Sequence, residues 1–132
     1  MVLSDRLFPH DLSAEESVIG SLLIDDLAFS KIASILEPEH FYMEANRLVF
    51  EIAKELFTRQ QPINQITIAH ELETVDKLES VGGRAYLAKV INVVPTSLHI
   101  KHYANLVRRT ATMRTLITAA EDISDIGFDN NP

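Results

Sequence analysis

The sequence predicts an all-α fold, with a compact head of about five or six short helices followed by one long protruding helix. Three observations carry this prediction. Apolar residues recur at spacings of three and four, which is typical of helices with one buried side. No segment alternates apolar and polar residues for long, as a half-buried strand would. Residues 98–126 contain neither proline nor glycine, so no strong helix breaker interrupts them.

Size and composition fit one folded domain and exclude several classes of site. The chain has 132 residues, of which 46% are hydrophobic and 23% are charged. It contains no cysteine, which rules out disulfides, thiolate zinc sites and cysteine nucleophiles. Its 19 acidic residues outnumber its 12 basic ones, so a broad phosphate-binding face is not expected. No apolar run approaches the roughly 20 residues of a membrane span, and we expect a cytoplasmic protein without a membrane partner.

The head is expected to span residues 13–96, after an extended arm of residues 1–12 that contains Pro9. Ser13 and Glu16 have the spacing of a capping box, which predicts that Ser13 is the N-cap of the first helix. The apolar residues of this helix that we expect to be buried are Val18, Ile19, Leu22 and Leu23.

A second helix is expected to begin with Asp26 as its cap and to end before Pro38. The following turn, residues 37–42, should deliver Phe41 and Tyr42 to the core. The predicted buried side of this second helix consists of Leu27, Ile32, Ile35 and Leu36.

A third, longer helix is predicted over residues 44–58, and Thr67 is expected to cap a short fourth one. The fourth helix would bury Ile68 and Leu72. The third would bury a stripe, with Phe50 and Ala53 on its flank; the stripe is Leu48, Val49, Ile52, Leu56 and Phe57.

The end of the head contains two more elements. Residues 77–81 predict a single turn, which Gly82 and Gly83 end by supplying the positive φ of a helix terminus. A helix over residues 84–93 follows, and Ser97 is expected to cap the long final helix. The predicted buried residues of the 84–93 helix are Tyr86, Leu87, Val90 and Ile91.

The final helix, residues 97–126, would be roughly 40 Å long. Its far end would extend past so small a head, and an uncovered apolar stripe on such a helix indicates an interface. We expect either a return helix or another subunit to cover it. Residues 127–132 have turn chemistry and would form the tip of a helical hairpin that is truncated there. The predicted self-association surface is Tyr103, Leu106, Met113, Leu116, Ile117, Ala120 and Ile123.

No motif predicts a metal site or a cofactor site. His70-Glu71 begins like a zinc-protease helix, but Thr74 stands where the second histidine would be. His99 and His102 are spaced to share a metal ion, yet no third ligand follows at a sensible spacing. Gly82-Gly83 lacks the Gly-Lys-Ser/Thr ending of a phosphate loop.

Catalysis and direct nucleic-acid binding are not expected either. Glu15-Glu16 and Asp25-Asp26 occupy helix starts, where they favour the helix dipole. A hydrolase using His40 or His70 is the enzymatic alternative, but no constellation around them requires it. The basic residues of the final helix are spread around its circumference; they are Lys101, Arg108, Arg109 and Arg114.

Six fragments in order, from residue 9 to about 120, resemble the N-terminal domain of DnaB-type replicative DNA helicases. They are PHDLSAEESVIGSLL (9–23), ILEPEHFY (35–42), RLVF (47–50), PINQIT (62–67), GGRAYL (82–87), and YA (103–104) with RTLI (114–117). Asn46 stands where that family usually has histidine, and Asn64 where it usually has aspartate.

The resemblance implies a role in assembly. Helicases of this family form hexameric rings in bacteria and some plastids, and a C-terminal motor domain uses ATP and Mg²⁺ to move along DNA. The chain would be part of the N-terminal collar, a trimer of dimers, and would help to dock primase. It would form a dimer as a fragment, contact DNA only through the full-length ring, and have no motor activity of its own. The alternative is a free-standing helical adaptor or helicase-loader-like protein, which a reading frame continuing past Pro132 into Gly-x-x-x-x-Gly-Lys would exclude.

Overall fold

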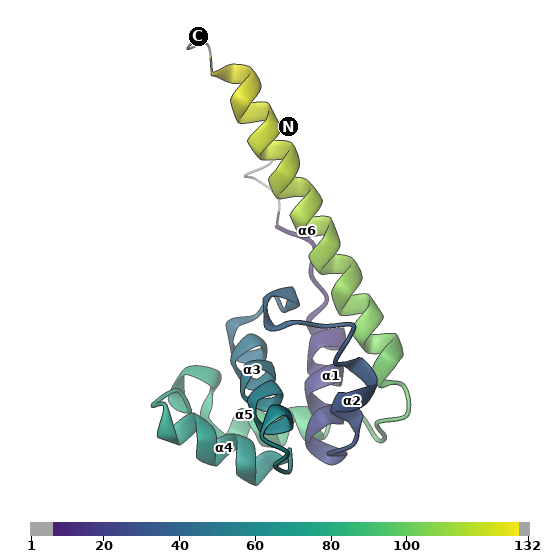
Figure 1. Cartoon of the computed structure of the whole chain (residues 1–132), viewed down its shortest axis with the longest axis vertical. Coiled ribbons are helices and arrows are strands. Elements are labelled where there is room, and N and C mark those ends of the chain that lie inside the picture. The colour runs from purple at the N-terminus through teal and green to yellow at the C-terminus, as the bar shows by residue number, and fades with distance from the viewer. Residues whose placement is uncertain (1–6, 130–132) are drawn as a thin grey trace.

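The computed structural model describes residues 7–129 and confirms the all-α prediction, since this part of the chain contains six α-helices and no strand (Figure 1). Two short 3₁₀ turns, η2 (Pro38–His40) and η3 (Glu79–Val81), lie between them. The helices are α1 (Leu12–Ile24), α2 (Ala28–Ile32), α3 (Glu44–Thr58), α4 (Gln65–Thr74), α5 (Gly83–Ile91) and α6 (Ile100–Phe128).

Helices α1 to α5 form the head, and α6 rises from it as one unbroken rod (Figure 1). Helix α1 is the centre of the head, because α3, α5 and α6 all pack against it. This explains why α1 is buried on almost every side, including the small residues Ser17, Gly20 and Ser21. The core continues through the aromatic rings of Phe29, Phe41 and Phe50.

The predicted start of α1 is wrong by two residues. Asp11, not Ser13, is the N-cap, and its Oδ1 accepts a hydrogen bond of 2.9 Å from the backbone N–H of Ala14. Aspartate caps a helix as well as serine does, and the earlier start turns Ala14 and Glu15 into the head. Ser13 therefore lies inside the helix, where its carbonyl accepts a hydrogen bond from the hydroxyl of Ser17.

The second helix is shorter than predicted, and Asp26 does not cap it. Leu27, which we expected to be buried, is 72% exposed. Asp25 has the organising role instead: its Oδ1 accepts from the backbone N–H of Leu27 at 3.0 Å, and its Oδ2 accepts from the hydroxyl of Ser97 at 2.7 Å. These hydrogen bonds, the one from Ser97 first, lower the pKa of the Asp25 carboxyl.

Ser97 consequently does not cap α6, which begins three residues later without a side-chain cap. A similar correction applies to α4: Asn64 is its N-cap, and Thr67 completes the reciprocal capping box from the third helical position. In both cases the residue type is suited to a cap. The sequence alone does not show that Ser97 bonds to Asp25 instead of capping α6, or that Asn64 and not Thr67 is the N-cap of α4.

Helix α3 has the predicted bounds, but its buried side is rotated from the predicted stripe. Phe50, expected on the flank, is fully buried, whereas Phe57 is 40% exposed. Phe41 enters the core as predicted, while Tyr42 stays 37% exposed. The rotation follows from the ring cluster, since Phe50 lies between Phe29 and Phe41 with centroid distances of 5.3 and 4.9 Å.

The glycines of the head have two structural roles: they adopt a positive φ, and they allow two helices to approach closely. Gly82 and Gly83 have φ of 101° and 70°, which confirms the predicted helix break before α5. Gly20 allows α1 and α5 to touch: a Cβ at this position would lie 2.2 Å from the backbone oxygen of Val90.

Candidate self-association surface

The first part of α6 packs against the head through a narrow apolar face. Its four buried residues follow a spacing of four, three and four, so they share one face of the helix. This face packs chiefly against α1, and also against α2. The four residues, which are not members of the predicted surface, are Ile100, Ala104, Val107 and Ala111.

Two arginines fasten α6 where it leaves the head. Arg114 donates to the backbone oxygens of Pro9 at 2.9 Å and His40 at 2.7 Å, and its guanidinium lies 5.5 Å from the centre of the Tyr42 ring. Arg108 donates to the backbone oxygen of Ile35 at 2.9 Å. Residues 7–11 are therefore tied to α6, and they run beside it (Figure 1). Burial lowers the pKa of Arg114, which nonetheless stays charged because guanidinium groups keep their proton in proteins.

A buried polar network supports the aromatic ring beneath Arg114. Glu15, which is fully buried, accepts from the backbone N–H groups of Tyr42 at 2.7 Å and Met43 at 3.3 Å, and from the Asn46 amide at 3.0 Å. The Tyr86 hydroxyl donates in turn to the amide oxygen of Asn46. Burial raises the pKa of the Tyr86 hydroxyl, so it remains a donor.

Sequence reasoning missed this network. It assigned Glu15 and Glu16 together to the helix dipole, but only Glu16 reaches the surface, where it pairs with Lys89 at 3.3 Å. Only the folded chain shows that Glu15 points inward, because its partners lie 27 or more residues away along the sequence.

The seven residues of the predicted surface divide into two groups. Tyr103 and Leu106 are partly buried and pack against the core of the head. The other five lie further along α6, and at about 100° per residue they project roughly opposite the face that meets the head. Leu116 is 64% exposed and Ile123 is 69% exposed, whereas Met113 and Ile117 are partly buried. We call these five the distal apolar face; they are Met113, Leu116, Ile117, Ala120 and Ile123.

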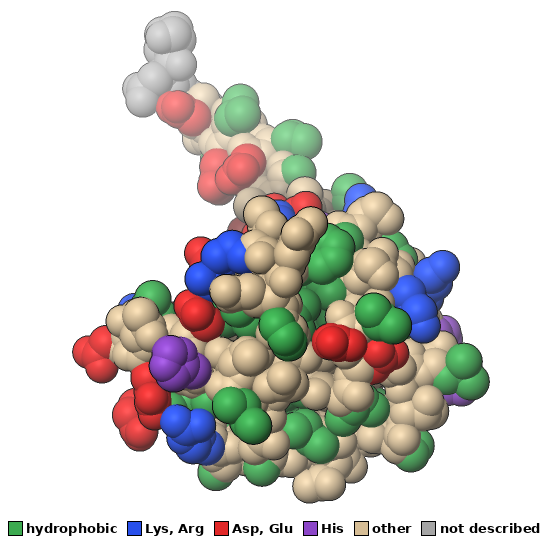
Figure 2. Space-filling view, turned by 60° about the horizontal axis from the view of Figure 1, so that its bottom comes forward, with side chains coloured by type: hydrophobic (Ala, Val, Ile, Leu, Met, Phe, Trp, Pro, Cys, Tyr) green, Lys and Arg blue, Asp and Glu red, His purple; other side chains and the backbone are tan. Residues whose placement is uncertain are grey.

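Charge is divided unevenly along α6. The half nearest the head carries Lys101, Arg108 and Arg109, whereas the far half carries Glu121, Asp122 and Asp125. Acidic and hydrophobic side chains lie together on the protruding part of the helix (Figure 2). Because two of the basic residues, Arg108 and Arg114, donate to backbone oxygens, the helix does not present one concentrated basic patch.

The histidines considered as possible ligands lie on the surface. His70, His99 and His102 are exposed, and within residues 7–129 no group of three or more histidine, aspartate and glutamate side chains is arranged to hold a metal ion. None of the helices in this part of the chain combines the length and apolar character that crossing a membrane requires. The distal apolar face is the feature of the described residues that best indicates a function.

The comparisons with known proteins agree on one family. Residues 7–109 match the model of the DnaB-like helicase N-terminal domain. The replicative DNA helicase DnaB of Geobacillus stearothermophilus is 32% identical over 127 residues, which is 96% of this chain but 28% of that protein. The chain therefore spans less than a third of the length of this relative.

Solved structures agree with the sequence comparison. The N-terminal domain of DnaB helicase from Mycobacterium tuberculosis superposes with a TM-score of 0.91 at 32% identity, covering 94% of this chain and 90% of that one. The N-terminal domain of DnaB helicase from Helicobacter pylori, described together with its interactions with primase, shares the fold with a TM-score of 0.75 at 23% identity, covering 87% and 89%.

Proposed function

Because the chain belongs to the family of DnaB-like helicase N-terminal domains, we propose that it is an assembly domain of a hexameric replicative helicase. In this proposal the head and α6 form part of the N-terminal collar of the ring. The chain contributes no motor activity. ATP, Mg²⁺ and DNA are handled by the part of the helicase that this chain does not match, since it covers 28% of the Geobacillus relative.

The observation that carries the proposal is the distal apolar face. Four of its five residues, all but Met113, lie beyond Arg114, which is the last residue of α6 that forms a hydrogen bond to the head in the described chain. Large apolar side chains that project together from an isolated helix favour burial against a partner, at about 25 cal/mol per Å² of apolar surface removed from water. A second copy of the chain supplies the same face, and symmetric use of one patch gives a dimer, the unit from which a trimer of dimers is built.

Primase is the second proposed partner. The support is the Helicobacter pylori domain, which has this fold and is described with its interactions with primase. We place this contact on the assembled collar and assign no individual residue to it. The location we propose for the whole complex is the bacterial cytoplasm, or a plastid, in line with the bacterial relatives.

The proposal is tested by placing a charge on the distal apolar face. Leu116→Asp and Ile117→Asp should each raise the dissociation constant of the dimer by at least about 100-fold, since each removes an apolar contact and would bury a carboxylate. Sedimentation velocity over a concentration series measures the change. The near-ultraviolet circular dichroism of the head's buried aromatic rings should stay that of the wild-type chain, because both side chains lie outside the core of the head.

Leu27→Asp is the matched control. Leu27 is 72% exposed, comparable to the 64% of Leu116, but it lies on the head. This variant should sediment like the wild type. A dimer that persists unchanged in Leu116→Asp and Ile117→Asp would contradict the proposal.

A further inference from the structure

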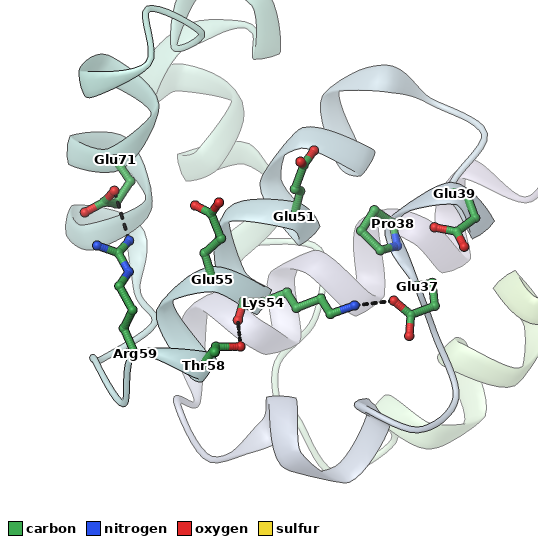
Figure 3. A pocket seen from close by; sticks show the side chains of 9 residues that line it. All are labelled: Glu37, Pro38, Glu39, Glu51, Lys54, Glu55, Thr58, Arg59 and Glu71. Atoms are coloured by element: carbon green, nitrogen blue, oxygen red, sulfur yellow. Dashed lines mark hydrogen bonds and ion pairs between the residues drawn. The ribbon is translucent and has the colours of Figure 1, made fainter.

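The head carries a second surface that self-association through α6 does not use. A groove of about 750 Å³ lies between η2, α3 and α4 (Figure 3). Five of its nine lining residues are glutamates, against one lysine and one arginine. No residue of α6 lines it.

Two of the glutamates are neutralised by the two cations. Lys54 pairs with Glu37, and Arg59 pairs with Glu71 at 3.1 Å, as Figure 3 shows. Glu51 and Glu55 form no ion pair with another residue of the described chain. They lie one turn apart on α3, so their carboxylates also repel each other. The groove therefore holds negative charge on Glu51 and Glu55 that no ion pair of the described chain compensates.

The same two carboxylates border an apolar hollow. This hollow has a volume of about 260 Å³ and lies between α3 and the end of α4. Leu72 and Ile52 form its buried floor, Leu48 is partly buried, and Val75 is 49% exposed at its edge. The exposed Lys77 also lines the hollow, so its rim carries two carboxylates and one cation. Its size and lining suit an apolar side chain from outside, which would bring the neighbouring part of a partner over Glu51 and Glu55.

We propose that this hollow with its acidic rim docks a basic amphipathic segment of a partner protein. An apolar side chain of the segment fills the hollow, and lysine or arginine side chains on either side meet Glu51 and Glu55. Charge complementarity selects this occupant, because complementary rim charges speed association and exclude partners of the wrong sign. An acidic segment or a nucleic acid would be repelled, because Glu51 and Glu55 outnumber Lys77 at the rim. The site lies on the head and does not depend on the proposed self-association of α6.

A fluorescent 14-residue peptide of leucine and lysine at helical spacing is the probe, titrated into the 132-residue chain and followed by anisotropy. Glu51→Gln/Glu55→Gln should weaken binding roughly tenfold at low ionic strength and flatten its salt dependence, because two rim charges are lost. Val75→Ser should weaken binding with the salt dependence retained, since it removes apolar contact alone.

Glu121→Gln/Asp125→Asn is the matched control, with the same spacing and the same change of net charge but on the far half of α6. It should bind the peptide as the wild type does. Equal loss in both double variants would show attraction to net charge alone, and unchanged binding in Glu51→Gln/Glu55→Gln would show that the peptide binds elsewhere. Either result overturns the proposal, as does the absence of measurable binding to the wild type.

Discussion

Single residues fix how closely the head helices approach each other, and Gly20 does so most directly. Gly20→Ala should lower the free energy of unfolding by about 3 kcal/mol, the upper end for overpacking a core. The added Cβ would lie 2.2 Å from the backbone oxygen of Val90, so α1 and α5 would have to separate. Urea denaturation followed by circular dichroism measures the change.

Gly127 supplies the control for this substitution. It lies in α6, and a Cβ there meets nothing within 4 Å. Gly127→Ala should therefore leave the global stability unchanged or slightly raised, since alanine favours a helix by up to about 1 kcal/mol over glycine. If Gly20→Ala were as well tolerated as Gly127→Ala, the close packing of α1 on α5 would be wrong.

His40 makes the stability of the η2 turn depend on pH. Its Nδ1 accepts a hydrogen bond of 2.8 Å from the backbone N–H of Glu37, which only the neutral ring can do. Burial, and then the charge of Arg108, lower the pKa of His40, with a smaller lowering effect from Arg114; Glu39 and Glu37 oppose this. The unfolded chain therefore binds the proton more readily than the folded one.

The sign of the pH effect follows from this difference. The contribution of His40 is present above its ordinary pKa of about 6.5 and is lost as the pH falls from there through the lowered folded value. Between pH 7.5 and 5.5 the wild type should lose more stability than His40→Asn, by up to about 1 kcal/mol, the net value of one hydrogen bond. Thermal unfolding of both proteins at several pH values measures the difference, and parallel pH profiles would contradict it.

At the scale of elements, α6 consists of two halves with different support. Its first half is held by four buried residues and two arginines, while residues 115–128 form no hydrogen bond or ion pair with the head within the described chain. A helical stretch of this length without tertiary support is marginal in water. The far half should thus depend on a partner for its stability.

Hydrogen exchange should reveal this division. At a concentration where the chain is monomeric, amides of residues 116–128 should exchange rapidly, whereas those of residues 104–111 should be protected with the head. Raising the concentration until the chain self-associates should slow exchange in the far half alone. Strong protection of the far half in the monomer would contradict a helix that needs a partner.

The sequence predicted elements better than it predicted their ends. Helix α3 has the predicted bounds because its apolar spacing is strong over fifteen residues. Ser13, Ser97 and Thr67 were wrongly chosen as caps, because a suitable Asx residue or another use of the hydroxyl lay nearby. Capping residues differ by only about 1 kcal/mol, and tertiary contacts easily outweigh so small a preference.

At the scale of the whole molecule, long-range contacts were the part that the sequence could not supply. The family was inferred from the resemblance of six fragments, and the protruding helix was predicted from local patterns; both are confirmed. The face of α6 that packs against the head was not predicted. Its buried residues are Ile100, Ala104, Val107 and Ala111; two of them are small alanines, and the burial of all four depends on α1. The groove on α3 and α4 brings together residues up to 34 positions apart, from Glu37 to Glu71, which no local motif encodes.

The contacts of Arg114 fix α6 where it leaves the head, and the rest of the helix extends from this point as a lever. Arg114 joins Pro9, His40 and Tyr42 at the point where the helix leaves the head, so this junction acts as the fulcrum. The end of α6 lies about 20 Å beyond it. A tilt of about 5° at the fulcrum therefore swings that end by about 2 Å, roughly half the width of a side-chain contact. A shift of residues 7–11 would therefore be magnified at the distal apolar face.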